Sequence, residues 1–406
     1  MSPTFVLPPS LDAASLDVYT KTYGASVLEL DGSLATAPAP PDLIDLTHGD
    51  TRAFIPPAVA AADFHSALAE NTEAYTAYRG SSRLRARIAP RLGQLLGRAV
   101  DPDRELIVTP GTQGGLFAAL SALVSPGDRV ALPDPEYFMN ERILSYLGAV
   151  PVRLPIEQDD KGRLSIGADH LAAARAARPR LLLLSHPNNP TGGVYETSTI
   201  QALADMAVEE DLVVVVDQLY CRLIYPGAQY THLGALPGMI GRTVTLVGPS
   251  KTESMSGYRV GAAVGPPPVV EAMERIVSLA SLRAPGYCQQ VLRHWMEDDA
   301  EWLDQRTAEH KALRDLMVER LRSIPGVSVT PPAGSSYMFP LVESLRWARN
   351  GPADDHEIAV AIKAAGVLVS PGYQFGPAGR ARFRVNFSQD KKRLLSAAER
   401  ITSVLS

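Results

Sequence analysis

The sequence predicts an α/β fold: a large domain with a mostly parallel sheet covered by helices, followed by a smaller α+β domain. Fully apolar segments of strand length, such as residues 181–184 and 212–216, alternate with segments of helical spacing. Strands that are apolar on both faces belong in a parallel sheet that helices cover on both sides. After about residue 268 the pattern changes to a long helical stretch and then short strands, which indicates a separate α+β unit.

The elements are expected in the following order. Residues 1–41 are rich in proline and hold one short helix at 13–23, so they form an extension without a core of its own. A strand is expected at residues 44–49 and a loop at 111–115. Further strands are expected at 105–108, 129–132, 181–184, 212–216, 243–247, 327–330, 337–341, 367–370 and 382–386. Helices are expected at 58–69, around 84–85, at 116–124, from 138, at 200–210 and from 268 to about 324.

These elements divide the chain into three parts. The predicted parts are an N-terminal extension (residues 1–41), a large domain (42–290) and a small C-terminal domain (291–406), with the extension packing on the small domain. The chain has 406 residues and 46% hydrophobic content, enough for one large core or two unequal cores.

The composition excludes several classes of function. The net charge of −5 gives no basic field for nucleic acid, and no stretch reaches the roughly 18 apolar residues of a membrane span. Only two cysteines are present, which fits a reducing compartment, and the N-terminus does not resemble a signal peptide. We expect a cytoplasmic protein that binds neither nucleic acid nor membrane, and we assign no metal site.

The segment after the strand at 243–247 carries the first candidate site. A Gly-Pro pair ends that strand, Ser250 and Lys251 follow, and Arg259 comes eight residues later. An amine that is partly desolvated at the end of a buried strand can act as a nucleophile, and the donors of an arginine match phosphate oxygens. Pyridoxal phosphate requires both groups, one for its aldehyde and one for its phosphate. Alone, the segment fits an ordinary loop with a surface lysine equally well.

Two other predicted strands are followed by candidate cofactor residues. Ligands of open parallel sheets bind beyond the carboxyl ends of the strands. Thr112 and Gln113 lie in a glycine-rich segment between a strand and a helix, where backbone N–H groups can hold a phosphate. The ring of Tyr137, which follows the next strand, can stack on a flat cofactor. Each of these residues, taken alone, also fits an ordinary loop or core position.

A buried strand that ends in a carboxylate gives a further candidate. Asp217 follows four valines, and a carboxylate in such apolar surroundings needs a polar partner, for example a protonated pyridine nitrogen. Tyr220, three residues later, can reach the phenolic oxygen of the same cofactor, and Asn189 can reach it from another loop.

Together and in this order, the segments resemble the class I and II aminotransferases, which are pyridoxal-phosphate enzymes of fold type I. No single motif is specific, but the ordered set is, and it covers the chain from about residue 42 to the C-terminus. The residues that carry it are Gly49, Tyr75 with Gly80, Leu84 and Arg85, residues 111–113, Tyr137, residues 189–192, Asp217 and Tyr220, Ser250 and Lys251, Arg259, and residues 384–387.

The resemblance implies roles for the residues near the cofactor ring. Lys251 would form an imine with the cofactor and then move protons on the substrate. Asp217 would keep the pyridine nitrogen protonated, so that the ring accepts electrons. Asn189 and Tyr220 would hydrogen-bond the ring oxygen.

It also implies how the phosphate is held. The backbone of Thr112 and Gln113, with Ser250 and Arg259, would bind it within one chain. Tyr75 would reach the phosphate of the neighbouring subunit, so the working unit would be a homodimer.

The substrate α-carboxylate would pair with Arg384, beside Asn189 and the backbone of Gly49. Arg283, in the loop 281–286, is a further candidate. It would bind a polar or acidic distal group of the substrate across the dimer interface, or it is a surface arginine at the end of its helix.

The implied function is transfer of an amino group from an amino acid to a 2-oxo acid. The alternative on the same fold is β-elimination at a C–S bond, oxidation or decarboxylation. Departures from the family pattern keep this alternative open: Gln218 stands where an acidic residue is common, Gly248 where many relatives have a hydroxyl, and residues 334–339 differ from the usual segment. A non-enzymatic DNA-binding regulator is disfavoured, because residues 1–41 show no helix-turn-helix pattern.

Overall fold

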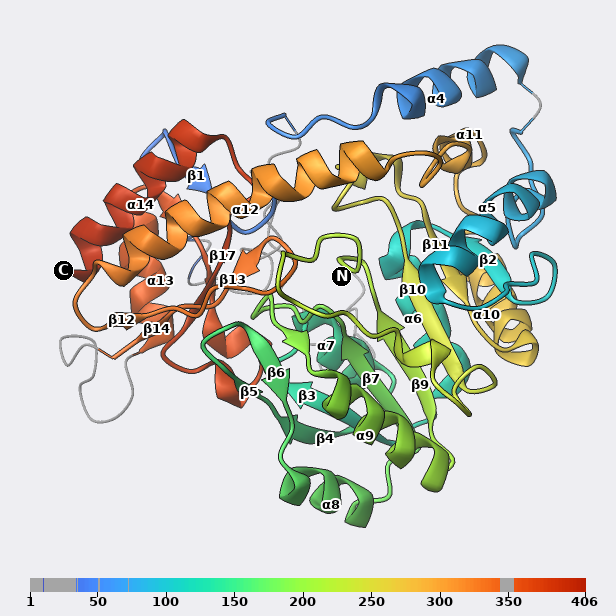
Figure 1. The fold of residues 1–406 in the computed structure, drawn as a ribbon, viewed down its shortest axis with the longest axis horizontal. Coiled ribbons are helices and arrows are strands. Elements are labelled where there is room, and N and C mark those ends of the chain that lie inside the picture. The colour runs from blue at the N-terminus through green and yellow to red at the C-terminus, as the bar shows by residue number, and fades with distance from the viewer. Residues whose placement is uncertain (1–9, 11–33, 35, 50–51, 72, 344–353) are drawn as a thin grey trace, which may run out of the picture.

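The computed structural model describes Ser10, Leu34 and residues 36–49, 52–71, 73–343 and 354–406. At its centre is a seven-stranded sheet in the order β2-β11-β10-β9-β7-β3-β4 (Figure 1). All neighbours pair in parallel except β11, which is antiparallel to β10 and β2. The predicted mostly parallel sheet is therefore confirmed. Its strands are β2 (Leu106–Thr109), β3 (Arg129–Asp134), β4 (Val150–Pro155), β7 (Leu181–Ser185), β9 (Val213–Asp217), β10 (Thr243–Val247) and β11 (Gly261–Val264).

Helices cover the sheet on both faces because the side chains of its central strands alternate between two cores. Leu183 of β7 and Val215 of β9 lie in one apolar cluster, whereas Leu184 and Val216 lie in the other. On the first face lie α6 (Gly111–Leu123), α7 (Phe138–Tyr146) and α10 (Pro267–Ala280), and on the second α8 (Ala168–Ala176) and α9 (Thr197–Glu209). A third cluster joins α5 (Ser82–Leu96) to β2 and β11.

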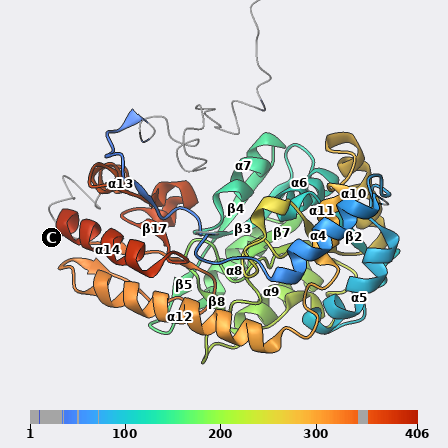
Figure 2. The same ribbon diagram turned by 90° about the horizontal axis from the view of Figure 1, so that it is seen from above.

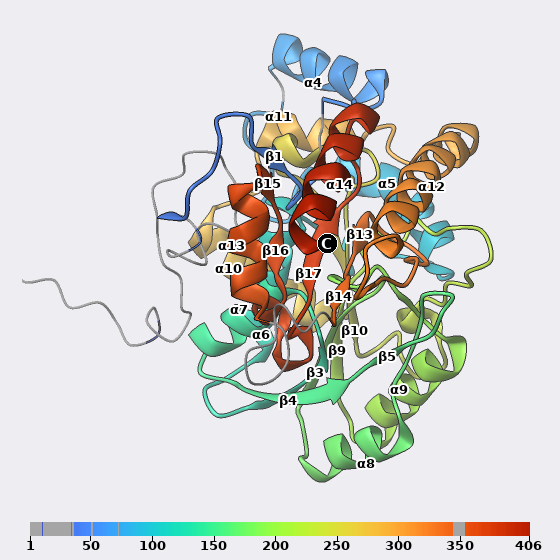
Figure 3. The same ribbon diagram turned by 90° about the vertical axis from the view of Figure 1, so that its left-hand side faces the viewer.

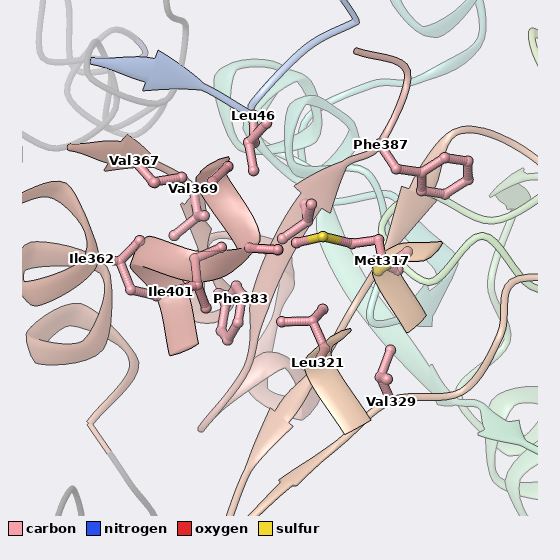
Figure 4. Packing of buried hydrophobic residues seen from close by; sticks show 14 of the residues in the cluster. Leu46, Met317, Leu321, Val329, Ile362, Val367, Val369, Phe383, Phe387 and Ile401 are labelled. Atoms are coloured by element: carbon pink, nitrogen blue, oxygen red, sulfur yellow. The ribbon is translucent and has the colours of Figure 1, made fainter. Parts of the chain in front are cut away.

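A further apolar core lies beside the sheet and is built mainly from the C-terminal third of the chain (Figures 2 and 4). Its helices are α12 (Ala300–Arg322), α13 (Asp355–Ala364) and α14 (Lys391–Leu405), and its strands are β12 (Val327–Ser328), β13 (Tyr337–Met338), β14 (Leu341–Val342), β15 (Val367–Leu368), β16 (Ser370–Pro371) and β17 (Phe383–Asn386). In Figure 3, α13, α14 and β17 lie next to one another on this side of the molecule.

The chain near its N-terminus joins this second core. β1 (Ile44–Asp45) pairs in parallel with β15, and Leu34 is fully buried in the same cluster. Leu223 and Tyr225 also enter it, although they come from the middle of the chain. The division at residues 41 and 290 stays a prediction, and the helix expected at residues 13–23 falls outside the described residues.

The remaining elements are short or peripheral. α4 (Ala58–Glu70) lies at the edge of the molecule in Figure 1. A small sheet combines β5 (Glu157–Gln158), β6 (Arg163–Ser165) and β8 (Val194–Tyr195). Short 3-10 helices occur at Leu233–Ala235, Ser256–Tyr258, Gln290–Leu292, Gly372–Phe375 and Pro377–Gly379. Among the described residues, no helix is long and apolar enough to cross a membrane.

Several local expectations are wrong. Residues 111–115 are not a loop: α6 begins directly after Pro110, and these residues form its first turns. The continuous helix expected from 268 to 324 is interrupted, since α10 ends at Ala280 and only α11 (Gly286–Gln289) precedes α12. The strand expected at 44–49 is reduced to two residues, because β1 has a partner, β15, along two positions only.

Candidate active site

The site lies where the carboxyl ends of the parallel strands meet the second core. Lys251 follows β10 and Asp217 ends β9, two neighbouring strands. Asn189 follows β7 and Tyr137 follows β3. The parallel pairing of β3, β7, β9 and β10 places these four residues at one edge of the sheet, although 114 positions separate the first from the last in the chain.

Arg259 and Gly261 lie close to the backbone at the start of α6. Gly111 has φ +72°, and a Cβ atom there would lie 2.6 Å from Nη2 of Arg259. The Arg259 guanidinium therefore rests against the backbone of the first turn. A Cβ on Gly261 would lie 2.7 Å from the backbone nitrogen of Thr112, so the strand after Arg259 also approaches this turn closely. A helix N-terminus with an adjacent arginine suits a phosphate group.

Beside this helix N-terminus stand the groups predicted for the cofactor ring. The hydroxyl of Tyr137 donates to Oε1 of Gln113 at 3.2 Å, which fixes its ring next to α6. Burial raises the pKa of Asp217 to about 6, while a hydrogen bond from the backbone of Leu219 and the charge of Lys251 act in the opposite direction. The Lys251 amine has no hydrogen-bond or ion-pair partner within the described part of the chain, and its residue lines a cavity, so it remains available to a ligand.

Tyr220 lines the same cavity as Lys251. Its hydroxyl is buried and has no partner at hydrogen-bonding geometry, although the side chains of Tyr337 and Ser336 lie close enough to affect its pKa, which burial raises. A buried hydroxyl of this kind requires a partner, and the oxygen of a bound ring would supply one.

Arg384 is almost fully buried and is held in place by three acceptors. Its guanidinium donates to Oδ1 of Asn189 at 2.8 Å, to the carbonyl of Thr47 at 3.0 Å and to Oγ of Ser370 at 3.2 Å. It also lies over the ring of Tyr337, 4.1 Å from the centroid. The Nε atom is buried and has no partner among the described residues, so one donor remains for a carboxylate.

A cavity of about 210 Å³ opens beside Lys251. The loop after β10 contributes Lys251, whereas Ser336, Asn386 and Ser388 come from the C-terminal third of the chain, beside residues of the second core. Its wall is mostly polar, with hydroxyl, imidazole and amide groups. The lining residues are His48, Gly49, Tyr220, Leu223, Ser250, Lys251, Ser254, Ser256, His310, Ser336, Asn386 and Ser388.

Comparison with known proteins identifies the family of the chain. The family model described as aminotransferase class I and II matches residues 41–401. The chain belongs to the class I and II aminotransferase family. It is 32% identical to the putative aminotransferase YugH of Bacillus subtilis, over 83% of this chain and 85% of that protein. It is 30% identical to an aspartate aminotransferase of Musicola paradisiaca, over 84% of each chain.

Solved structures of aminotransferases match the fold. The fold matches a crystal structure of an aspartate aminotransferase from Rhodobacter sphaeroides with a TM-score of 0.85 and 38% identity, covering 91% of this chain and 93% of that one. Aminotransferases of this fold depend on pyridoxal phosphate, and the chain is a transferase of this class. The alternative of a lyase is not favoured by relatives that are named aminotransferases.

Two of the predicted residues lie away from the lysine of their own chain in this aminotransferase. Tyr75 is 87% exposed. The guanidinium carbon of Arg283 lies 5.2 Å from the Tyr75 ring centroid, and Arg283 donates to the carbonyl of Thr76. Among the described residues, neither side chain has a hydrogen bond, ion pair or ring contact with another residue predicted for the site, apart from the contact between Tyr75 and Arg283. Their predicted roles concern the neighbouring subunit and stay predictions.

Sequence reasoning assigned no role to Tyr337. Burial raises the pKa of its hydroxyl, but the charges of Arg384 and Lys251 together with hydrogen bonding to Tyr220 and Asn386 act in the opposite direction, and the pKa is lowered to about 8. Its ring stands edge-on to that of Tyr220, with 5.5 Å between centroids. The only signal in the sequence was the atypical segment 334–339, which contains this tyrosine.

Proposed function

We propose that the protein transfers an amino group from an amino acid to a 2-oxo acid, with pyridoxal phosphate bound to Lys251. The observation that carries this proposal is the amine of Lys251, which has no partner among the described residues and whose charge acts on the nearby Asp217. Arg259 stands at a helix N-terminus, which suits a phosphate, and Arg384 is buried with a spare donor, which suits a carboxylate.

The residues present fit the cofactor. The first turn of α6 at Thr112 and Gln113, with Ser250 and Arg259, would hold its phosphate, and the Tyr137 ring would lie against its ring system. When bound, pyridoxal phosphate supplies an electron-accepting ring that stabilises negative charge at the substrate α-carbon.

Other residues control charge and protons around the ring. The carboxylate of Asp217 would pair with the pyridine nitrogen and keep it protonated, while the free hydroxyl of Tyr220 and the amide of Asn189 would bind the ring oxygen. The amine of Lys251 would take the proton from the substrate α-carbon, because this residue lines the cavity and its amine has no other partner among the described residues.

The substrate is oriented by its carboxylate. Arg384 would bind it, with Asn189 and the Gly49 backbone alongside, and this contact fixes which α-carbon bond faces the lysine. The polar cavity around Ser336 and Ser388 would receive the rest of the substrate.

We also propose a homodimer in a reducing, cytoplasmic setting. The exposed fractions of Ile55 (70%), Tyr75 (87%), Leu279 (84%) and Leu282 (54%) are high for large apolar side chains, and a second subunit would cover such residues.

The proposed reducing setting rests on the cysteines, because both are unpaired. The division of the chain at residues 41 and 290 stays a proposal: a separate C-terminal core supports it, although Ile44, Leu46 and Phe54, which it assigns to the large domain, pack in that core.

The Lys251→Ala variant tests the proposal. It should fold, retain cofactor only through non-covalent contacts and lose both the absorption band of the lysine-bound cofactor and all transfer activity. Lys161→Ala, a change in an exposed turn, is the matched control and should behave as wild type. A Lys251→Ala protein that keeps the band would show that another lysine binds the cofactor.

An amino-acid panel distinguishes transfer from the alternatives. In single turnover, transfer converts the cofactor to its amine form and releases one 2-oxo acid, and a second 2-oxo acid restores the starting spectrum. Release of ammonia without an acceptor, or consumption of oxygen, would contradict the proposal.

A further inference from the structure

A buried carboxyl group lies behind the site, between β3 and α7. Glu136 is 3% exposed, and the sequence assigned it no role. Its side chain accepts hydrogen bonds from the backbone nitrogen of Tyr137 at 2.7 Å, from the backbone nitrogen of Ser185 at 3.0 Å and from the hydroxyl of Ser185. One side chain thus joins the ends of β3 and β7, the two strands that lead to Tyr137 and Asn189.

The hydrogen bonds continue from Ser185 to the predicted carboxylate-binding group. The Ser185 hydroxyl donates to Glu136, and its oxygen accepts from the backbone nitrogen of Asn189 at 3.0 Å. The side chain of Asn189 in turn accepts from Arg384 at 2.8 Å. A continuous series of hydrogen bonds therefore runs from Glu136 through Ser185 and Asn189 to the guanidinium of Arg384.

The chemistry of this series requires an acceptor at position 136. The backbone nitrogens of Tyr137 and Ser185 can only donate, and a serine hydroxyl that accepts from Asn189 uses its single hydrogen toward Glu136. A glutamine would present an NH₂ group to at least one of these donors. Burial raises the pKa of Glu136 to about 8, although the hydrogen bonds from Ser185 and Tyr137 lower it, so burying this carboxyl group has a cost that an apolar residue would avoid.

We propose that Glu136 is a positioning residue: through Ser185 it fixes Asn189 and thereby aligns Arg384 for the substrate α-carboxylate. The inference rests on the proposed carboxylate-binding role of Arg384 and Asn189. Glu136 itself touches neither substrate nor cofactor, so it acts on carboxylate affinity and not on proton transfer.

The test compares E136Q and S185A with wild type in the cofactor-loaded protein. The probe is 2-methylalanine, which has the α-amine and α-carboxylate but no α-hydrogen to remove, and its Kd is read from the change in the cofactor spectrum. Both variants should weaken binding about tenfold, the scale of one misaligned charge-assisted contact. The control E141Q changes a glutamate of α7 that pairs with Arg153 outside this series, and should leave Kd unchanged.

A double variant and the kinetics complete the test. If the two residues act in one series, the Kd of E136Q/S185A for 2-methylalanine should be no higher than that of the single variant with the higher Kd. In the same variants KM for the amino acid should rise, while kcat changes less than about threefold. Variants with lower thermal stability but wild-type Kd would overturn the proposal and leave Glu136 a structural residue. Independent, additive losses would also overturn it. Wild-type protein that takes up cofactor but does not bind 2-methylalanine would overturn the role of Arg384 as well.

Discussion

At the scale of single residues, Asp217 shows how burial and charge together set the properties of a site. Four valines precede it, so the carboxylate stands at the end of an apolar strand, and burial raises its pKa to about 6. At neutral pH it is still mostly ionised and can pair with a cationic nitrogen. Below pH 6 it gains a proton and loses the charge that such a pair needs.

This gives a pH-dependent prediction for cofactor binding. Affinity of the cofactor-free protein for pyridoxal phosphate should fall as pH is lowered through 6, by up to about tenfold per pH unit from Asp217 alone. The second ionisation of the phosphate lies near pH 6 and adds its own dependence.

Asp217→Asn keeps the phosphate effect but has no carboxyl to protonate, so its affinity for pyridoxal phosphate should be lower and less pH-dependent. Titrations followed by absorbance between pH 5 and 8 measure this. Equal pH slopes for both proteins would exclude the proposed pairing.

At the scale of elements, a buried ion-pair network holds the loop that carries Lys251. Arg222 pairs with Glu253, two residues after the lysine, and with Asp299 at 2.6 Å, directly before α12. The Arg222 side chain is 8% exposed and that of Glu253 is 2% exposed. Burial raises the pKa of Glu253 and the charge of Arg222 lowers it. The network therefore links the lysine loop to the helix that leads into the second core.

Replacing one partner of the ion pair should lower the stability of the protein more than replacing both partners. Arg222→Leu leaves Glu253 buried without its cation, which typically destabilises by about 3–5 kcal/mol. Arg222→Leu/Glu253→Leu leaves no unpaired charge inside the loop and should recover part of the loss. Thermal unfolding of the cofactor-free proteins, with Tm compared at one concentration, checks the order wild type, double variant, single variant. A double variant less stable than Arg222→Leu would contradict this order and show that Glu253 stabilises the loop through contacts other than its pair with Arg222.

At the scale of the whole molecule, the exposed surface around Tyr75 raises the question of assembly. Arg283 lies over the rings of both Tyr75 and Tyr78, so this surface is ordered by contacts within its own chain. Its aromatic side chains remain exposed, however, and Tyr75 is the residue proposed to reach the phosphate site of a second subunit.

Mixing variants tests this assembly. Tyr75→Ala and Lys251→Ala homodimers should each be inactive or nearly so, whereas heterodimers should regain one intact site, in which the lysine comes from one chain and the tyrosine from the other. Activity after subunit exchange is the measurement. The matched control mixes Lys251→Ala with the double variant Tyr75→Ala/Lys251→Ala, which offers no intact lysine and should stay inactive. No recovery after proven exchange would place Tyr75 in the site of its own chain.

The sequence by itself determined the features that depend on local pattern. Apolar segments of strand length and helical spacing identified the mostly parallel sheet, and short motifs after strands identified Lys251, Asp217 and Asn189 as candidates. Local pattern failed where tertiary contacts decide structure. Residues 111–115 contain three glycines, which favour a loop, but packing of α6 against the sheet and α10 makes them helical. β1 is short because it depends on β15 for its partner.

Only the tertiary structure decided which side chains meet. Arg384 and Asn189 are 195 positions apart, and Glu136 and Ser185 are 49 apart, so no window of sequence contains either pair. An isolated glutamate after a strand has the same local appearance whether it faces water or a buried serine. Its burial and its donors exist only because β3 and β7 lie side by side, so its place behind the site follows from the fold and not from its neighbours in sequence.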